Sequence, residues 1–377
     1  MNLATRNERI DFLRGIAILL VLLLHFRFSF DIKNTFFAVF IPENLLHAFT
    51  INGNYGVTMF YVISGYLITL RSLQRYGRLD SIRPFNFYQL RCAKIFPGLI
   101  LALTLVNLLA LLPLKSFANK PDTTSMWLTN FSALTFWYNI LLQKIGGYFN
   151  YATTAFWSLS VEEVFYLLFP IVCIVAKRKS HLFLIASVLI IFCTTFRYLH
   201  RDNELFFIYD YFACFDAIAI GCLAAILKNE SYDIFFQNRF TQLLAAIALC
   251  TTYLIGIHGN ETFGFTVISS MTAILILSSD QRLIPQNIPI KMINKCIGFI
   301  GRISYELYLY HLIVLGLLRD FFRSPKLGFM ATNILFCAFI LVSLSIAFLC
   351  HYYFTEPLNR KIRNFRSPTT AVLEAKC

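Results

Sequence analysis

The stretch RIDFLRGIAILLVLLLHFRF, from Arg9 to Phe28, decides the fold. Its centre, Ile16 to Leu24, is an unbroken apolar run, and the whole stretch has the roughly 20 residues that a helix needs to cross a ~30 Å hydrocarbon core. Basic residues precede the run, as in a secretory signal peptide, but no small-residue cleavage site follows it. We therefore expect a membrane helix that is retained.

Nine further segments of comparable length and apolarity follow along the chain. The ten segments run approximately over 10–28, 55–73, 92–114, 157–177, 180–198, 207–227, 239–257, 262–279, 297–318 and 329–354. They predict an all-α, polytopic transmembrane helix bundle of about ten helices. Another stretch, 126–142, is apolar but contains polar residues such as Asn130 and Asn139. It either lies in the interface, re-enters the membrane, or spans it and raises the count to eleven.

The composition excludes a water-soluble domain. Hydrophobic residues make up 58% of the chain and charged residues only 14%, whereas a soluble domain has about 25% charged residues. The formal net charge of +13 would suit nucleic acid if the basic residues gathered on one polar face. They lie instead between apolar runs of bilayer length, so we predict membrane lipid as the surroundings and no nucleic-acid partner.

Lys and Arg are unevenly distributed between alternate loops. With ten helices and the N-terminus inside, 21 of the 33 fall on the cytoplasmic side and eight outside. The other four, Arg14, Arg27, Arg197 and Arg302, lie within helices or at their ends. The positive-inside rule therefore places both termini in the cytoplasm. The longest loops, about 29–54 and 115–156, then face outward, where a large acceptor would meet the protein.

The sequence indicates one membrane domain without a metal site. Its ten cysteines are scattered and form no CxxC pair, so we predict neither a metal nor a permanently bound cofactor. There is no internal repeat or low-complexity tract. We expect a single integral membrane domain over 1–366 and a short cytoplasmic tail over 367–377.

Arg14 and His25 are the first candidates for function, because ionisable side chains inside a membrane are costly. They are eleven residues apart, and at ~100° per residue eleven steps return to within roughly 20° of the same helix face. Their separation along that face is about 16 Å. Asp11 is close enough to Arg14 in sequence to pair with it. An interfacial arginine and a packing histidine are the alternative interpretation of this pattern.

Five more ionisable positions lie in or beside the apolar segments: Glu162, Glu163, Asp216, His311 and Glu356. Asp216 lies mid-segment, where snorkelling is hard, whereas the others have structural alternatives. The paired glutamates could interact favourably with a helix N-terminus, a tyrosine hydroxyl could satisfy His311, and Glu356 would need a cationic partner because it ends the tenth segment. A neutral histidine suits the role of general base on a hydroxyl, and an arginine suits the phosphates of a polyanionic donor. A GxSxG nucleophile motif is absent, since Ile63-Ser64-Gly65 lacks the first glycine.

The order of motifs resembles the acyltransferase-3 family of integral membrane proteins, which includes O-antigen and exopolysaccharide acetylases. The matching stretches are Asp11-x-Leu13-Arg14-Gly15 with His25, Gly56 to Thr69, Arg91-x-x-Lys94-Ile95-x-Pro97, Trp157-Ser158-Leu159 with Glu162 and Tyr166, Gly301-x-Ile303-Ser304-Tyr305 with Tyr308 and His311, and Glu356 beside Pro357. Together they cover almost the whole chain in order.

The resemblance implies transfer of an acyl group, commonly acetyl from acetyl-CoA, to a hydroxyl of an envelope glycan or lipid-linked sugar at a bacterial cytoplasmic membrane. It implies that His25, Arg14 and Glu162 are catalytic, with Glu162 either orienting His25 or binding the sugar. The predicted substrate-binding residues are Asp11, Arg91, Lys94, Trp157, Tyr166, Asp216, His311 and Glu356.

Three departures from the family pattern affect these expectations. Lys94 stands where arginine is frequent and cannot form a bidentate fork. Cys214 stands where an arginine often precedes the aspartate, which leaves Asp216 without its expected partner. We also expect no additional hydrolase-like soluble domain. The rival interpretation is a transporter or flippase that uses the same charges as a solute pathway, although the two halves show no repeat symmetry.

Overall fold

The computed structural model describes residues 7–228, 236, 238–278, 288–322 and 327–364, and within these ranges every regular element is helical. The predicted tail, 367–377, lies outside the described residues. The longer helices are α1 (Glu8–Ser29), α4 (Asn54–Tyr76), α5 (Pro84–Ala110), α8 (Phe156–Ala176), α9 (Lys179–Leu199), α11 (Tyr211–Leu227), α13 (Arg239–Ile255), α14 (Gly264–Leu277), α15 (Ile288–Arg302), α16 (Ser304–Phe322) and α17 (Phe329–Leu349). Shorter elements are η1 (Ile32–Asn34), α2 (Phe37–Phe40), α3 (Glu43–Ile51), η2 (Leu79–Ser81), α6 (Met126–Leu134), α7 (Tyr138–Ile145), α10 (Glu204–Phe207), the π-helix η3 (Cys350–Thr355) and α18 (Glu356–Asn364).

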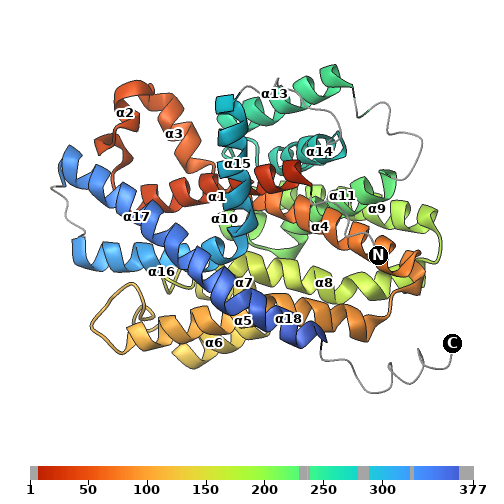
Figure 1. Cartoon of the computed structure of the whole chain (residues 1–377), viewed down its shortest axis with the longest axis horizontal. Helices are drawn as coiled ribbons and strands as arrows, with labels where there is room; N and C mark the ends of the chain where they lie inside the picture. The colour runs from red at the N-terminus through yellow and green to blue at the C-terminus, as the bar shows by residue number, and fades with distance from the viewer. Residues whose placement is uncertain (1–6, 229–235, 237, 279–287, 323–326, 365–377) are drawn as a thin grey trace.

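The all-α membrane bundle predicted from the sequence is confirmed. Seven helices in the described ranges are long and apolar enough to cross a membrane, and α13 and α14 are shorter apolar helices. In Figure 1 most of the long helices lie roughly side by side, while α15 stands across α1. The count of ten spans and the cytoplasmic position of both termini stay predictions.

The structure corrects one predicted segment and excludes one of the alternatives for another. The predicted ninth span, 297–318, is not one helix: α15 ends at Arg302, and α16 starts at Ser304 in another direction (Figure 1). Hydropathy averaged over a span did not detect this break, because Arg302 and Ser304 beside it are outnumbered by apolar residues. The stretch 126–142 is divided between α6 and α7, of nine and eight residues. A nine-residue helix is only about 14 Å long, so this stretch does not cross a ~30 Å core as one helix.

Helices α4 and α11 cross at two glycines that approach the partner backbone reciprocally. A Cβ atom on Gly65 would lie 2.0 Å from the carbonyl oxygen of Ile218, and one on Gly221 would lie 2.0 Å from that of Val62. Such an approach is possible only without a side chain, as at many helix crossings in membranes. Gly65 therefore serves a packing function within the Ile63-Ser64-Gly65 motif.

Helices α1 and α15 also cross at two glycines that each approach the backbone of the partner helix. A Cβ on Gly15 would lie 2.2 Å from the carbonyl oxygen of Ile297, and one on Gly301 would lie 1.8 Å from that of Asp11. The first turns of α1 are therefore held directly against α15, immediately before the chain turns into α16. This contact fixes where Arg14 meets the start of α16.

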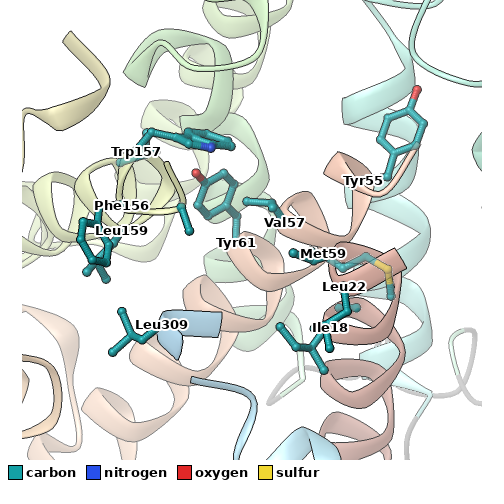
Figure 2. Close-up of a cluster of buried hydrophobic side chains, with 14 of the residues drawn as sticks. Ile18, Leu22, Tyr55, Val57, Met59, Tyr61, Phe156, Trp157, Leu159 and Leu309 are labelled. Atoms are coloured by element: carbon teal, nitrogen blue, oxygen red, sulfur yellow. The ribbon is translucent and has the colours of Figure 1, made fainter. Parts of the chain in front are cut away.

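The core between α1, α4 and α8 is packed with large side chains. Ile18 and Leu22 of α1 face Met59 of α4, and the ring of Tyr61 lies beside the indole of Trp157 (Figure 2). All five side chains are buried. The rings of Tyr61 and Trp157 meet edge to face with centroids 6.5 Å apart, a favourable arrangement for aromatic pairs. This packing fixes α8 relative to α1 and α4, the helices that carry most of the candidate site.

Candidate functional site

Arg14 and His25 lie on one face of α1, as their spacing predicted, and both contact α16. The Nε of Arg14 donates to the hydroxyl of Ser304 at 3.1 Å. The Nδ1 of His25 lies 3.3 Å from the Nε2 of His311. Because Ser304 and His311 are both on α16, this helix runs along the whole polar stripe of α1.

The two histidines form an intramembrane pair with different surroundings. His25 is half-buried, whereas His311 is completely buried. Their rings meet edge to face with centroids 4.9 Å apart. His25 Nδ1 also lies 2.9 Å from the Val21 carbonyl oxygen, and His311 Nδ1 lies 2.8 Å from that of Tyr308. The tyrosine hydroxyl expected to satisfy His311 is therefore replaced by backbone carbonyls and a second imidazole.

Hydroxyl groups continue the polar region around this pair. The Tyr308 hydroxyl lies 2.5 Å from that of Ser158 on α8. Beyond His25, the Ser29 hydroxyl lies 2.5 Å from that of Tyr151, whose ring is covered by the Arg319 guanidinium at 4.7 Å. These groups can donate to or accept from a hydroxyl compound near His25.

Glu162 connects α8 to α4. Its Oε1 accepts a hydrogen bond of 2.5 Å from the Ser64 hydroxyl and another from the Tyr166 hydroxyl. Its hydrogen bonds in the described part of the chain thus go to Ser64 and Tyr166, and the expected orienting contact with His25 is not among them. Sequence reasoning considered Ser64 only as a nucleophile and missed it as a partner of the carboxylate.

Basic side chains gather below Glu162, towards the predicted cytoplasmic end. Arg71 of α4 lies within electrostatic range of Arg14 and Arg91, and Lys94 of α5 lies within range of the same two arginines. The Arg91 guanidinium also stacks over the Tyr166 ring at 4.3 Å. We call Arg14, Arg71, Arg91 and Lys94 the basic cluster. Sequence reasoning treated Arg71 as a loop charge, although its position seven residues after Ser64 puts both on one face of α4.

Two acidic side chains of α8 lie within electrostatic range of the basic cluster. Lys94 interacts with Glu162, and the buried Glu163 interacts with Arg91 and Lys94. Glu163 Oε1 is buried without a hydrogen-bond partner. Glu162 and Glu163 thus lie among the cations of the cluster, and Arg363 of α18 is a further cation within range of Arg71. An anionic ligand would find a net positive field here.

Asp216 has a structural partner that the sequence did not identify. Its carboxylate pairs with Arg197 of α9 at 2.6 Å, and both side chains are buried. Arg197 also donates to the carbonyl oxygens of Thr262 and Ala213 and to Thr266 of α14. The pair thus connects α9, α11 and α14. Substrate binding by Asp216 stays a prediction, and its carboxylate is occupied by these contacts.

The remaining predicted residues are dispersed. The Trp157 indole is buried and packs against Tyr209 at 4.7 Å. Asp11 is buried at the crossing of α1 with α15, and its pairing with Arg14 stays a prediction.

Glu356 requires a correction. It does not end a helix, because α17 continues through η3 into α18. Its predicted cationic partner is Arg360, at 2.9 Å one turn further along α18. Pro357 directly follows the π-helical η3 and its neighbour Glu356, and the helix continues past it to Asn364.

An open groove of about 470 Å³ lies between α3 and the link from α13 to α14. Its polar lining includes Glu43, Asn44, His47 and His258. Asn52 holds the two walls together, donating to the Tyr253 carbonyl oxygen at 2.9 Å and accepting from the Ile257 N–H. A hydrogen bond and ion pair with Lys33 lower the pKa of Glu43, so this carboxyl is ionised at neutral pH.

The groove lies at the His25 end of α1. Arg27, two residues beyond His25, donates to Thr50 of α3 at 3.0 Å. Residues 29–54 form one of the loops predicted to face outward. The groove and the basic cluster therefore lie towards opposite ends of α1.

Comparisons of the sequence with known proteins find matching relatives. A family model described as "Acyltransferase domain" matches residues 7–352. A Staphylococcus aureus (strain MRSA252) protein named "Putative O-acetyltransferase SAR0937" is 26% identical over 344 residues, covering 84% of this chain and 54% of the relative. "O-acetyltransferase OatA" of S. aureus (strain NCTC 8325 / PS 47) is 24% identical over 312 residues, covering 75% of this chain and 49% of the relative. The chain thus spans about half the length of these curated relatives, and no solved structure matches it.

Proposed function

The chain belongs to the acyltransferase-3 family, and we propose that it is an O-acyltransferase that moves an acyl group, commonly acetyl, from acyl-CoA to a hydroxyl of a cell-envelope glycan such as O-antigen, exopolysaccharide or their lipid-linked sugar precursors. The proposal locates the enzyme in a bacterial cytoplasmic membrane. Its main support is that His25 and Arg14, the member of the basic cluster on α1, lie on one face of this helix and both contact α16.

The basic cluster suits the phosphates of the donor. Arg14, Arg71 and Arg91 carry guanidinium groups that can bind phosphate with two parallel hydrogen bonds. Arg71 is exposed, so a soluble nucleotide can reach it. The extended pantetheine arm of CoA would then direct the thioester towards His25, about 16 Å from Arg14 along α1.

His25 would act as the general base. Its Nδ1 is engaged by the Val21 carbonyl and His311, which leaves Nε2 for the acceptor. In the reaction Nε2 takes the proton of the acceptor hydroxyl while that oxygen attacks the thioester carbonyl carbon. The C–O ester bond forms and the C–S bond breaks. The CoA thiolate then receives the proton from the His25 imidazolium, so histidine is regenerated.

The groove at the other end of α1 suits the acceptor. Its amide, carboxylate and imidazole groups can hydrogen-bond sugar hydroxyls, which both donate and accept. The groove is open, as a polymeric or lipid-linked glycan requires. We therefore propose that saccharide units beside the acylated one bind there.

Mass spectrometry of envelope glycans from cells with and without this protein tests the function, because it identifies acceptor and acyl group together. We expect an O-acyl group that disappears with the protein and in a His25→Ala variant that still inserts in the membrane. His181→Ala, at an exposed histidine on α9, is the matched control. Isolated membranes should release free CoA from acetyl-CoA only when glycan is supplied. Glycan acylation that persists in His25→Ala would refute the assignment, and solute flux without CoA release would favour a transporter.

A further inference from the structure

His311 is in direct contact with His25, and the mechanism above gives it no task. It lies on α16, is completely buried, and places Nε2 3.3 Å from His25 Nδ1. The hydrogen-bond geometry of the pair determines where each ring carries its proton.

His311 must carry its proton on Nδ1. This atom lies 2.8 Å from the Tyr308 carbonyl oxygen and 3.1 Å from that of Leu307, and carbonyl oxygens only accept hydrogen bonds. A fully buried imidazolium would be costly without a carboxylate beside it, and the contacts of His311 within the described residues are these carbonyls and aromatic or imidazole rings. The ring is therefore neutral, and its Nε2 presents a lone pair to His25.

His25 then has the same tautomer. Its Nδ1 faces two acceptors, the Val21 carbonyl oxygen at 2.9 Å and the lone pair of His311 Nε2 at 3.3 Å. Nδ1 must therefore be the donor, and the basic lone pair of His25 lies on Nε2. Free imidazole side chains in water favour the opposite tautomer, with the proton on Nε2, so this contact geometry has to be maintained by the protein.

The Val21 carbonyl alone is a limited acceptor for this purpose. It lies four residues before His25 and already accepts the backbone N–H of the α-helix. When His25 takes a proton from the acceptor hydroxyl, its ring becomes an imidazolium and its Nδ1–H needs a stronger acceptor. The neutral lone pair of His311 is available for that role without placing a negative charge in the membrane.

We propose that His311 is a positioning residue that fixes the Nδ1–H tautomer of His25 and stabilises the imidazolium formed during acyl transfer. This role differs from the substrate binding that the sequence suggested for His311. It rests on the proposed function, since it requires His25 to be the general base. The role is analogous to that of the carboxylate behind the histidine in hydrolase triads, with a neutral acceptor in its place.

Two variants of similar volume separate this role from simple packing. His311→Leu removes the acceptor, whereas His311→Gln can place Oε1 near the position of Nε2 and accept from His25. We expect His311→Leu to lower kcat for acetyl transfer by about tenfold to hundredfold, below the ~10² to 10⁴ that a general base contributes, with KM for acetyl-CoA and glycan unchanged. His311→Gln should recover most of this loss. The control is Tyr310→Phe, at the residue next to His311 on α16. It removes a hydroxyl that donates to the Gly98 carbonyl oxygen of α5, and it should retain wild-type kcat.

A spectroscopic readout tests the tautomer without relying on activity. In protein labelled with ¹⁵N-histidine and held in detergent micelles, the His25 resonances, assigned with His25→Ala, should show a protonated Nδ1 and an unprotonated Nε2. In His311→Leu the population with the proton on Nε2 should increase. Wild-type kcat in His311→Leu, equal losses in the Leu and Gln variants, or a wild-type His25 protonated on Nε2 would each overturn the proposal. If wild-type protein transfers no acyl group at all, the proposed function fails, whereas the tautomer measurement still tests the histidine pair.

Discussion

Arg197 and Asp216, on neighbouring helices α9 and α11, form a buried ion pair in which all three guanidinium nitrogens of Arg197 donate hydrogen bonds. The carboxylate takes two of its hydrogen bonds, and Thr262, Ala213 and Thr266 supply further acceptors. Thr266 in turn donates to Asp216 at 2.8 Å. The polar groups of this cluster hydrogen-bond one another, so the cluster connects the helices. Few of its donors and acceptors are left to bind a substrate.

Breaking this pair should destabilise the protein. Asp216→Leu leaves an uncompensated buried guanidinium, for which we expect a loss of about 3–5 kcal/mol in the free energy of unfolding. The double variant Arg197→Met/Asp216→Leu should recover much of that loss, because no buried charge is left unpaired. Thermal unfolding in detergent measures both variants. The exposed pair of Arg78 and Asp80 provides the control: Asp80→Asn should not change the transition measurably. An unchanged melting temperature in Asp216→Leu would instead favour a role in binding substrate.

Arg71 should contribute to donor affinity through the CoA phosphates. Replacing Arg71 by Gln should raise KM for acetyl-CoA by roughly tenfold, the effect of about 1.4 kcal/mol, and leave kcat unchanged. The KM difference should vanish with S-acetylpantetheine, a donor without the nucleotide phosphates. Arg75→Gln, an exposed arginine on the following turn of α4, should behave like wild type. If Arg71→Gln raised KM equally for both donors, the basic cluster would not bind the CoA phosphates.

Substitutions in the groove beside α3 should raise KM for the acceptor glycan and leave KM for the acyl donor unchanged. Each hydrogen bond to a sugar hydroxyl is worth about 0.5–1.5 kcal/mol, so His47→Ala and His258→Ala should each raise KM for the glycan several-fold. The KM for acetyl-CoA should stay constant, as should both constants in His181→Ala. Steady-state assays that vary one substrate at a time measure these values. A change confined to the donor KM would show that the groove has another ligand.

The reciprocal glycine crossing of α4 and α11 should tolerate no side chain. Gly65→Ala or Gly221→Ala places a methyl group 2.0 Å from a backbone carbonyl oxygen, and we expect a loss of at least about 1–3 kcal/mol from overpacking. Gly328→Ala is the control, because nothing lies within 4 Å of the added carbon and its φ is −78°. Size-exclusion chromatography and thermal unfolding of the three variants in detergent measure these effects on folding and stability. Wild-type stability in both crossing variants would mean that the helices separate at no cost.

Helical periodicity predicted which residues share a face of one helix, but it could not predict contacts between residues of two different helices. The common face of Arg14 and His25 followed from 3.6 residues per turn, and the structure confirms it through their contacts with Ser304 and His311. Arg197 could not be identified as the partner of Asp216, because the contact depends on how α9 packs against α11. The link of Glu162 to Ser64 was missed for the same reason.

Hydropathy had a similar limit. Nine of the ten predicted segments each overlap one long helix, although α5 begins at Pro84 and not at 92. The segment 297–318 instead joined α15 to α16 across Ile303. The turn follows directly after the close contact of Gly301 with Asp11, and an average over residues cannot represent such a contact. The ordered motifs supplied the family membership, which the match over residues 7–352 confirms.

The contact of His25 with His311 joins residues that are 286 positions apart in sequence. A ribosome adding about 5–20 residues per second completes α16 on the order of 10–60 s after α1. During that interval α1 is already in the membrane, and neither Ser304 nor His311 exists yet to receive its polar groups. A chain that stops before α16 therefore lacks both contacts, and the polar stripe of α1 acquires them only when the last helices are inserted.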